Sequence, residues 1–89
     1  MIVEFDKSFE RSLKKVHDQV VLRRLKLLIL KAERSTGLKQ IPNIRKITGY
    51  SSYYRVRIGD YRVGIESRVD HTLRFIIIAH RKDIYKLFP

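Results

Sequence analysis

The sequence predicts an α+β fold in which a two-helix hairpin packs on one face of a mainly antiparallel four-stranded sheet, in the order β-α-α-β-β-β. Three observations lead to this class. Residues 53–66 alternate in polarity around a tight turn, two apolar stripes with helical spacing come before them, and a continuous apolar run follows. The chain has 89 residues, so we expect 1–89 to form a single domain.

The first predicted elements are a short strand and a short helix. Ile2–Phe5 is apolar and rich in β-branched residues, which favours a strand. A helix capped by Asp6 or Ser8 is predicted to end near His17. Its apolar stripe consists of Phe9, Leu13 and Val16.

A second helix is predicted between a cap at Asp18 and a stop at Gly37, and we expect it to form an antiparallel hairpin with the first. Its apolar stripe consists of Val21, Leu25, Leu28 and Ala32, widened by Leu22 and Ile29. Basic residues occupy its other faces. We interpret them as a solvated surface, with a second phosphate-binding strip as the alternative.

Residues 38–52 lose the hydrophobic period and contain Pro42, Asn43 and Gly49, which predicts an irregular connection. The isoleucines in this segment are expected to anchor it to the core. The anchors are Ile41, Ile44 and Ile47.

Residues 53–66 form the clearest pattern in the chain, a β-hairpin with Gly59-Asp60 in a type I′ or II′ turn. Alternation places Tyr54, Val56, Ile58, Tyr61, Val63 and Ile65 on a core face. It places Arg55, Arg57, Arg62 and Glu66 on the opposite face, beside Tyr53. An ordinary solvated face would mix Lys, Glu, Thr and Ser. The arginines therefore favour an anion-binding surface, because the guanidinium fork matches phosphate.

The remaining chain is predicted to form a central strand and a tail. Residues 72–79 are apolar on both faces, as expected for a strand with neighbours on either side. In the tail, Ile84, Leu87 and Phe88 fit either one helical turn or an irregular segment.

Composition limits the possible partners and sites. Twenty Lys and Arg against nine Asp and Glu give a net charge of +11, which favours a polyanionic partner. With no cysteine and no paired carboxylates, we expect no metal site and no cofactor. The acidic N-terminal residues do not fit a signal peptide, and no long apolar run suggests a membrane span, so a cytoplasmic protein is predicted.

The run from Tyr54 to Val63 and the run Ile78–Tyr85 carry the patterns Y-R-x-R-x-G-x-Y-R and H-R-x-D-x-Y. Together they resemble the RelE/ParE superfamily of type II toxin-antitoxin toxins. Length, charge and element order extend the resemblance over nearly the whole chain. RelE-like members are metal-independent RNases that cut messenger RNA in the ribosomal A site, and ParE-like members poison DNA gyrase.

The resemblance to the RelE-like branch implies roles for individual residues. The implied catalytic residues are Arg57, Arg62, Arg81 and Tyr85. The predicted RNA-binding residues are Arg55, His80, Lys82 and Tyr53, the last because it lies on the same side of its strand as Arg55. Well-studied members carry lysines where this chain has Arg55 and Arg57, and arginine is a poor base because it stays protonated. The general base is therefore open among Tyr85, Glu66 and His80, while Glu66 also fits an ion pair with Arg62 or Arg57.

The first functional hypothesis is a ribosome-dependent endoribonuclease that an antitoxin with an acidic segment holds inactive. The resemblance also implies a toxin-antitoxin assembly that binds operator DNA through the antitoxin. The alternatives are a ParE-like gyrase inhibitor and a basic module that binds RNA or protein without catalysis.

Overall fold

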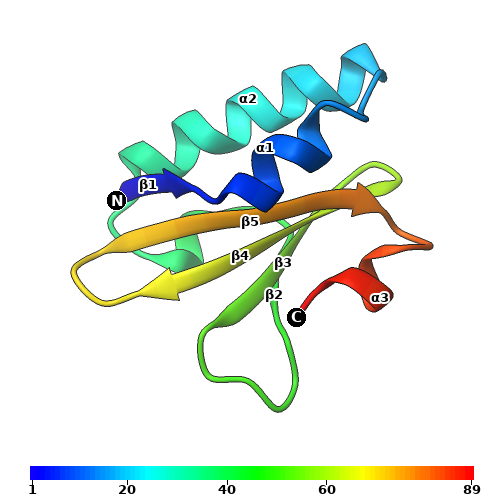
Figure 1. The fold of residues 1–89 in the computed structure, drawn as a ribbon. Coiled ribbons are helices and arrows are strands. Elements are labelled where there is room, and N and C mark those ends of the chain that lie inside the picture. Colours follow the sequence, from blue (N-terminus) through cyan, green and yellow to red (C-terminus); the bar gives the residue numbers. More distant parts are fainter.

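The computed structural model describes residues 1–89 and contains one five-stranded sheet in the order β1-β5-β4-β3-β2 (Figure 1). Its elements are β1 (Ile2–Phe5), α1 (Lys7–Leu13), α2 (Gln19–Arg34), the 3₁₀ turn η1 (Leu38–Gln40), β2 (Ile44–Lys46), β3 (Tyr53–Ile58), β4 (Tyr61–Arg68), β5 (Thr72–His80) and α3 (Ile84–Leu87). β1 pairs with β5 in parallel, and every other pair is antiparallel. The α+β class is confirmed, with one strand more than predicted.

Both N-terminal helices begin at the predicted aspartates. Asp6 accepts a hydrogen bond from the Ser8 backbone N–H at 3.1 Å, and Asp18 accepts one from the Val20 N–H at 2.9 Å. α1 ends at Leu13 rather than near His17. Beyond Leu13, the Lys15 and Val16 N–H groups bond to the Ser12 and Leu13 carbonyls, three residues back, so the last turn is tighter than an α-helix.

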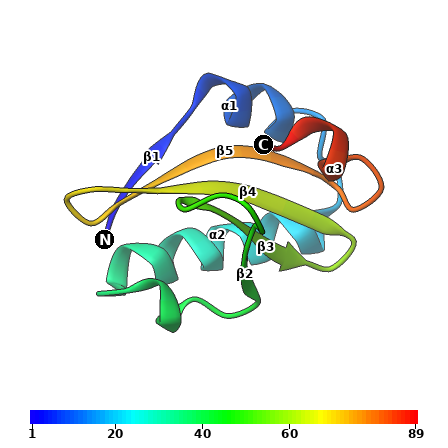
Figure 2. The same ribbon diagram turned by 90° about the horizontal axis from the view of Figure 1, so that it is seen from below.

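The main core lies between the sheet and the helices α1 and α2, which cover the same face (Figures 1 and 2). Phe9 from α1 and the predicted stripe of α2 pack onto apolar side chains of β3, β4 and β5. The buried sheet residues are Val56, Ile58, Val63, Ile65, Leu73, Phe75 and Ile78. The core face predicted for the hairpin is therefore confirmed.

A smaller core lies on the opposite face of the sheet, under α3. Ile84 and Phe88 pack there with Ile47 and Ala79. The Phe88 ring rests on Gly64 of β4, where a Cβ atom would approach the ring to 2.6 Å. The glycine thus leaves the space that α3 needs, and the tail forms a helical turn.

The prediction that residues 38–52 form only an irregular connection is wrong in one part. Ile44–Lys46 pairs with β3 as the edge strand β2, with Arg45 opposite Arg55. Three residues are too few to reveal alternation, and it is the pairing with β3 that makes them a strand.

The β3-β4 turn and the central strand agree with prediction. Gly59 has φ +56° and Asp60 is not in the positive-φ region, which is the pattern of a type II′ turn. β5 lies between β1 and β4 and carries apolar side chains on both faces. A bulge at Gly64/Ile65 shifts the register between β4 and β5.

The edge of β5 is covered in two ways. β1 pairs with β5 only as far as Phe75. Beyond that point, Ser8 of α1 donates a hydrogen bond to the Ile76 carbonyl, and the Ile78 N–H donates to Ser12 Oγ at 3.0 Å. α1 therefore continues the hydrogen bonding that β1 begins.

None of the helices combines the length and the apolar character that crossing a bilayer requires.

Candidate functional site

A cavity of about 460 Å³ opens on the sheet face opposite α1 and α2. Its lining consists of Asn43, Ile44, Arg45, Arg55, Arg57, Arg62 and Tyr85. We call it the arginine cavity. Three adjacent strands, β2, β3 and β4, supply its four arginines, and α3 supplies its tyrosine.

Strand pairing explains why the arginines meet. Arg57 lies directly opposite Arg62 across β3 and β4, and Arg45 lies directly opposite Arg55 across β2 and β3. Side chains opposite one another on a face are near neighbours, and like charges in that position destabilise a sheet. The sequence retains two such pairs side by side, which favours a role in binding an anion.

Arg62 is held in place by the turn next to it. Its Nη1 donates hydrogen bonds to the Gly59 and Tyr61 carbonyl oxygens, both at 2.9 Å. These bonds fix one nitrogen of the guanidinium and leave the others free to bind a ligand. The type II′ turn thus positions Arg62.

Tyr85 closes one side of the arginine cavity. The guanidinium carbon of Arg55 lies 4.6 Å from the centre of the Tyr85 ring, within the range of a cation-π contact. The Tyr85 side chain is 72% exposed, so its hydroxyl is accessible to solvent and to a ligand.

No carboxylate lines the arginine cavity. The hypothesis that Glu66 pairs with Arg62 or Arg57 is wrong, because Glu66 lies opposite Tyr53 and Arg74 in the sheet and forms no ion pair. The acidic residues that do form ion pairs are Glu4, Asp6 and Asp60. The positive charge of the cavity is therefore left for an external anion.

Of the eight site residues predicted from the sequence, four line this cavity. They are Arg55, Arg57, Arg62 and Tyr85. Tyr53 instead packs edge-on against Phe88, with ring centres 5.4 Å apart.

Three predicted site residues around the end of β5, His80, Arg81 and Lys82, do not line the arginine cavity. Arg81 Nε is 3.8 Å from an Asp60 carboxylate oxygen at the hairpin turn. His80 packs edge-on against Tyr61, with ring centres 5.6 Å apart, and its Nδ1 accepts a hydrogen bond from the Lys82 N–H. Arg81 is thus the one implied catalytic residue that does not line the arginine cavity, and its catalytic role stays a prediction.

Sequence reasoning missed Arg45 and Asn43 as parts of the site. The available signal was weak. In the triplet Ile44-Arg45-Lys46 an apolar residue is followed by a charged one, and in a strand these two side chains would point to opposite faces. Recognising it requires the pairing with β3.

Comparisons with known proteins concern the family and the fold of the chain. No protein-family model matches the chain. Over its full length, the chain is 43% identical to toxin RelE3 of Methanocaldococcus jannaschii, and the alignment of 90 residues covers 100% of both proteins. The chain belongs to the RelE toxin family.

Solved RelE structures share its fold. The RelE chain of a RelB-RelE antitoxin-toxin complex from Methanococcus jannaschii matches with a TM-score of 0.83 and 41% identity, covering 97% of this chain and 99% of that one. A RelE-RelB complex from Pyrococcus horikoshii matches with a TM-score of 0.72 and 22% identity, covering 90% of this chain and 93% of that one. The intact E. coli RelBE complex matches with a TM-score of 0.66 and 18% identity, covering 89% of this chain and 94% of that one. The RelE assignment thus rests on the sequence identity to the M. jannaschii toxin, and the more distant structures support the fold.

Proposed function

We propose that this RelE-family toxin is a metal-independent endoribonuclease that cuts ribosome-bound messenger RNA and that a cognate antitoxin neutralises. The observation that carries the proposal is the arginine cavity, in which four guanidinium groups and one tyrosine surround a space with no carboxylate. Such a site matches a phosphodiester, because guanidinium forks bind phosphate oxygens and an exposed aromatic ring can stack on a base.

The reaction that fits is attack of a ribose 2′-hydroxyl on the adjacent 3′-phosphate, with loss of the 5′-oxygen of the next nucleotide. Negative charge builds on the phosphate oxygens as the phosphorane forms. Arg57 and Arg62 lie opposite each other across β3 and β4, so both can stabilise that charge without rearrangement. Arg45 and Arg55 add positive charge from the neighbouring pair.

Tyr85 is the lining residue that can transfer a proton in this mechanism. A guanidinium does not release its proton, and the other lining residues, Asn43 and Ile44, carry no acid or base. The Tyr85 hydroxyl can donate or accept a hydrogen bond, and its ring is held against Arg55 at 4.6 Å. We assign it to the 2′-hydroxyl or to the leaving oxygen.

The proposal also includes contacts outside the arginine cavity. Arg81 follows β5 and lies near Asp60 of the turn whose Gly59 carbonyl holds Arg62, and this proximity supports a role in binding RNA next to the scissile phosphate. His80, Lys82 and Tyr53 complete the proposed RNA contacts.

The proposed protein partner is an antitoxin with an acidic segment. The relatives from M. jannaschii, P. horikoshii and E. coli were solved as complexes of RelE with RelB. This chain carries a net charge of +11, and the arginine cavity has no anion of its own. An acidic segment would offset that charge and exclude RNA.

Cleavage of messenger RNA on programmed ribosomes tests the proposal. Protein that has been treated with EDTA and dialysed before it is added to the ribosomes should generate new 5′ ends in phase with the codon in the A site, and Arg57→Ala/Arg62→Ala should not. As a comparison, messenger RNA 5′ ends and plasmid supercoiling are both measured in cells that express the protein. Intact transcripts together with altered supercoiling would favour gyrase inhibition and overturn the nuclease proposal.

A further inference from the structure

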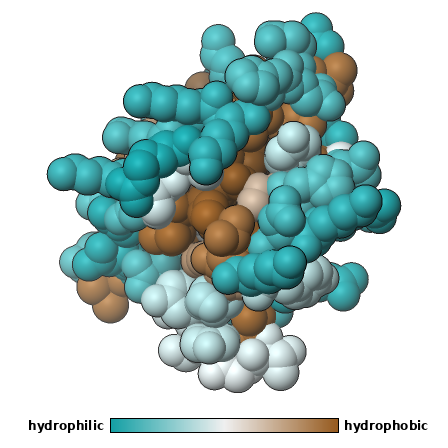
Figure 3. All heavy atoms as spheres, turned by 45° about the vertical axis from the view of Figure 1, so that its right-hand side comes forward, coloured by the Kyte–Doolittle hydropathy of each residue, from teal (hydrophilic) through white to brown (hydrophobic).

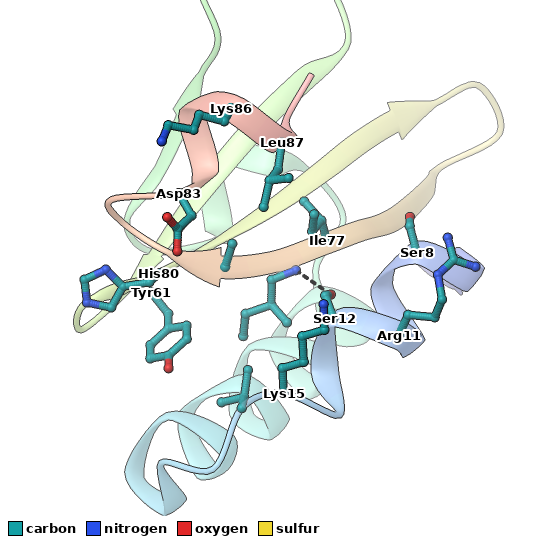
Figure 4. Close-up of a pocket in the computed structure, with 13 residues that line it drawn as sticks. Ser8, Arg11, Ser12, Lys15, Tyr61, Ile77, His80, Asp83, Lys86 and Leu87 are labelled. Carbon is teal, nitrogen blue, oxygen red and sulfur yellow. Dashed lines mark hydrogen bonds between the residues drawn. The ribbon is translucent and has the colours of Figure 1, made fainter.

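A second cavity, of about 600 Å³, lies between α1, the end of β5 and α3 (Figure 4). It shares no lining residue with the arginine cavity. Its floor is apolar and is formed by Val16, Ile77, Ile78, Ala79 and Leu87. Figure 4 shows Leu87 pointing from α3 toward β5, and Figure 3 shows an apolar hollow bordered by hydrophilic side chains on this side of the molecule.

The rim of the second cavity is mostly cationic. Arg11 comes from α1, Lys15 from the turn that follows this helix, and Lys86 from α3. Asp83 is the only carboxylate in the lining. An open apolar floor with three cations around it fits a ligand that combines a flat apolar group with negative charge.

The aromatic side of the cavity narrows the choice of ligand. Tyr61 and His80 line it with their rings edge-to-face, 5.6 Å between centres, so that one ring supports the other. Unpaired bases of RNA are commonly held on such rings, with phosphates bound by nearby cations.

We propose that the second cavity binds one nucleotide of single-stranded RNA, away from the cleavage site. The base lies on the apolar floor beside Tyr61, its phosphates contact Arg11 and Lys15, and Asp83 accepts a hydrogen bond from the base edge. The volume lies within the range of about 300–1,000 Å³ that is typical of small-molecule sites.

Occupation of this cavity also bears on the proposed nuclease, and this step rests on the proposed function. Tyr85 lines the arginine cavity, and the next residue, Lys86, lines the second cavity. An RNA strand that contacts both cavities would hold the short helix α3 from two sides. Tyr85 would then keep its contact with Arg55.

Two binding measurements test the proposal, and neither depends on cleavage. In the first, adenosine 5′-monophosphate is titrated while methyl NMR signals are followed. We expect the signals of Ile77, Ala79 and Leu87 to shift, and we expect R11A/K15A to abolish these shifts. K7A/K14A is the matched control, because it removes two exposed cations of the same segment that do not line the cavity.

In the second measurement, binding of a single-stranded RNA with 2′-O-methyl groups, which cannot be cleaved through the 2′-hydroxyl, is followed at several salt concentrations. R11A/K15A should reduce the slope of log affinity against log salt by about 1.4, because each phosphate contact contributes about 0.7 on a single strand. K7A/K14A should keep the wild-type slope.

Several outcomes would overturn the proposal. Shifts confined to Ile44 would place the nucleotide in the arginine cavity, and equal shifts with inorganic phosphate would show that the base is not bound. An unchanged RNA slope in R11A/K15A would exclude a strand-bound nucleotide, even if the free nucleotide binds. Tighter binding of an oligoglutamate peptide than of RNA would assign the cavity to an acidic protein. RNA binding that depends on Arg11 and Lys15 without any cleavage would support this site while the nuclease proposal fails.

Discussion

The Arg55 guanidinium carbon lies 4.6 Å from the centre of the Tyr85 ring. This contact joins β3, in the middle of the sheet, to α3, at the end of the chain. It places the one proton-exchanging group of the arginine cavity against a cation that is itself part of the cavity. The site therefore depends on the packing of Ile84 and Phe88, which holds α3 and with it Tyr85 against the sheet.

The first prediction concerns the Tyr85 hydroxyl. Tyr85→Phe should retain RNA binding, because the ring still stacks on Arg55, but should lower the single-turnover cleavage rate on the order of 10²-fold. Tyr85→Ala should lower both. The side chain is 72% exposed, so we expect neither change to affect folding. A near-normal rate for Tyr85→Phe would assign the residue to stacking alone.

The second prediction concerns Arg62, whose guanidinium is fixed by the Gly59 and Tyr61 carbonyls. Arg62→Ala should lower cleavage on the order of 10²-fold, and Arg62→Lys should recover only part of the loss because lysine has no fork. Arg62→Ala also removes two hydrogen bonds to the turn, so chemical denaturation should show a loss of stability of about 1 kcal/mol, too small to unfold the protein. Arg23→Ala, at an exposed position on α2, is the control and should cleave normally.

The third prediction concerns the antitoxin. Its affinity for this protein should fall as salt is added, because charge attraction to the arginine cavity is screened. R55E/R57E should weaken antitoxin binding and make its affinity less dependent on salt. The charge reversal Arg23→Glu should do neither. Purification from cells that express the native operon supplies the partner. Binding that is insensitive both to salt and to R55E/R57E would contradict the proposed contact.

The fourth prediction concerns acid stability. Hydrogen bonds from Ser8 and Arg74 lower the pKa of Asp6 from 3.8 to about 2. The folded state therefore holds this proton less tightly than the unfolded state, so Asp6 stabilises the fold above pH 4 and the contribution disappears as the pH falls from 4 to 2. Asp6→Asn keeps a good helix cap but should lose this pH dependence in urea unfolding. Asp83→Asn, at a cap without a side-chain hydrogen bond, should behave like the wild type.

Most of the fold followed from the sequence because its signals are local. The helix caps at Asp6 and Asp18, the alternation of β3 and β4, and the turn at Gly59 each depend on neighbouring residues. β2 could not be found in the same way. It has three residues, and its partner β3 lies seven or more residues further along the chain.

The site could be predicted where the alternation of side chains along a strand decides on which face of the sheet each one lies. Parity correctly placed Arg55, Arg57 and Arg62 on one face. It could not place the last residues of β5, because the register shift at Gly64/Ile65 changes which residues of β5 share a face with those of β4. His80 consequently faces the second cavity, and Arg45 entered the site only through β2.

The serines of α1 also have a consequence for aggregation. Ile76, Ile77 and Ile78 lie where β5 has lost its partner β1, and a strand edge with such an apolar sequence is a template for pairing with other chains. Ser8 and Ser12 occupy the polar backbone groups of Ile76 and Ile78. If α1 detached, this apolar strand edge would be exposed. The docking of a seven-residue helix thus covers the part of β5 that is best suited to pairing with another chain.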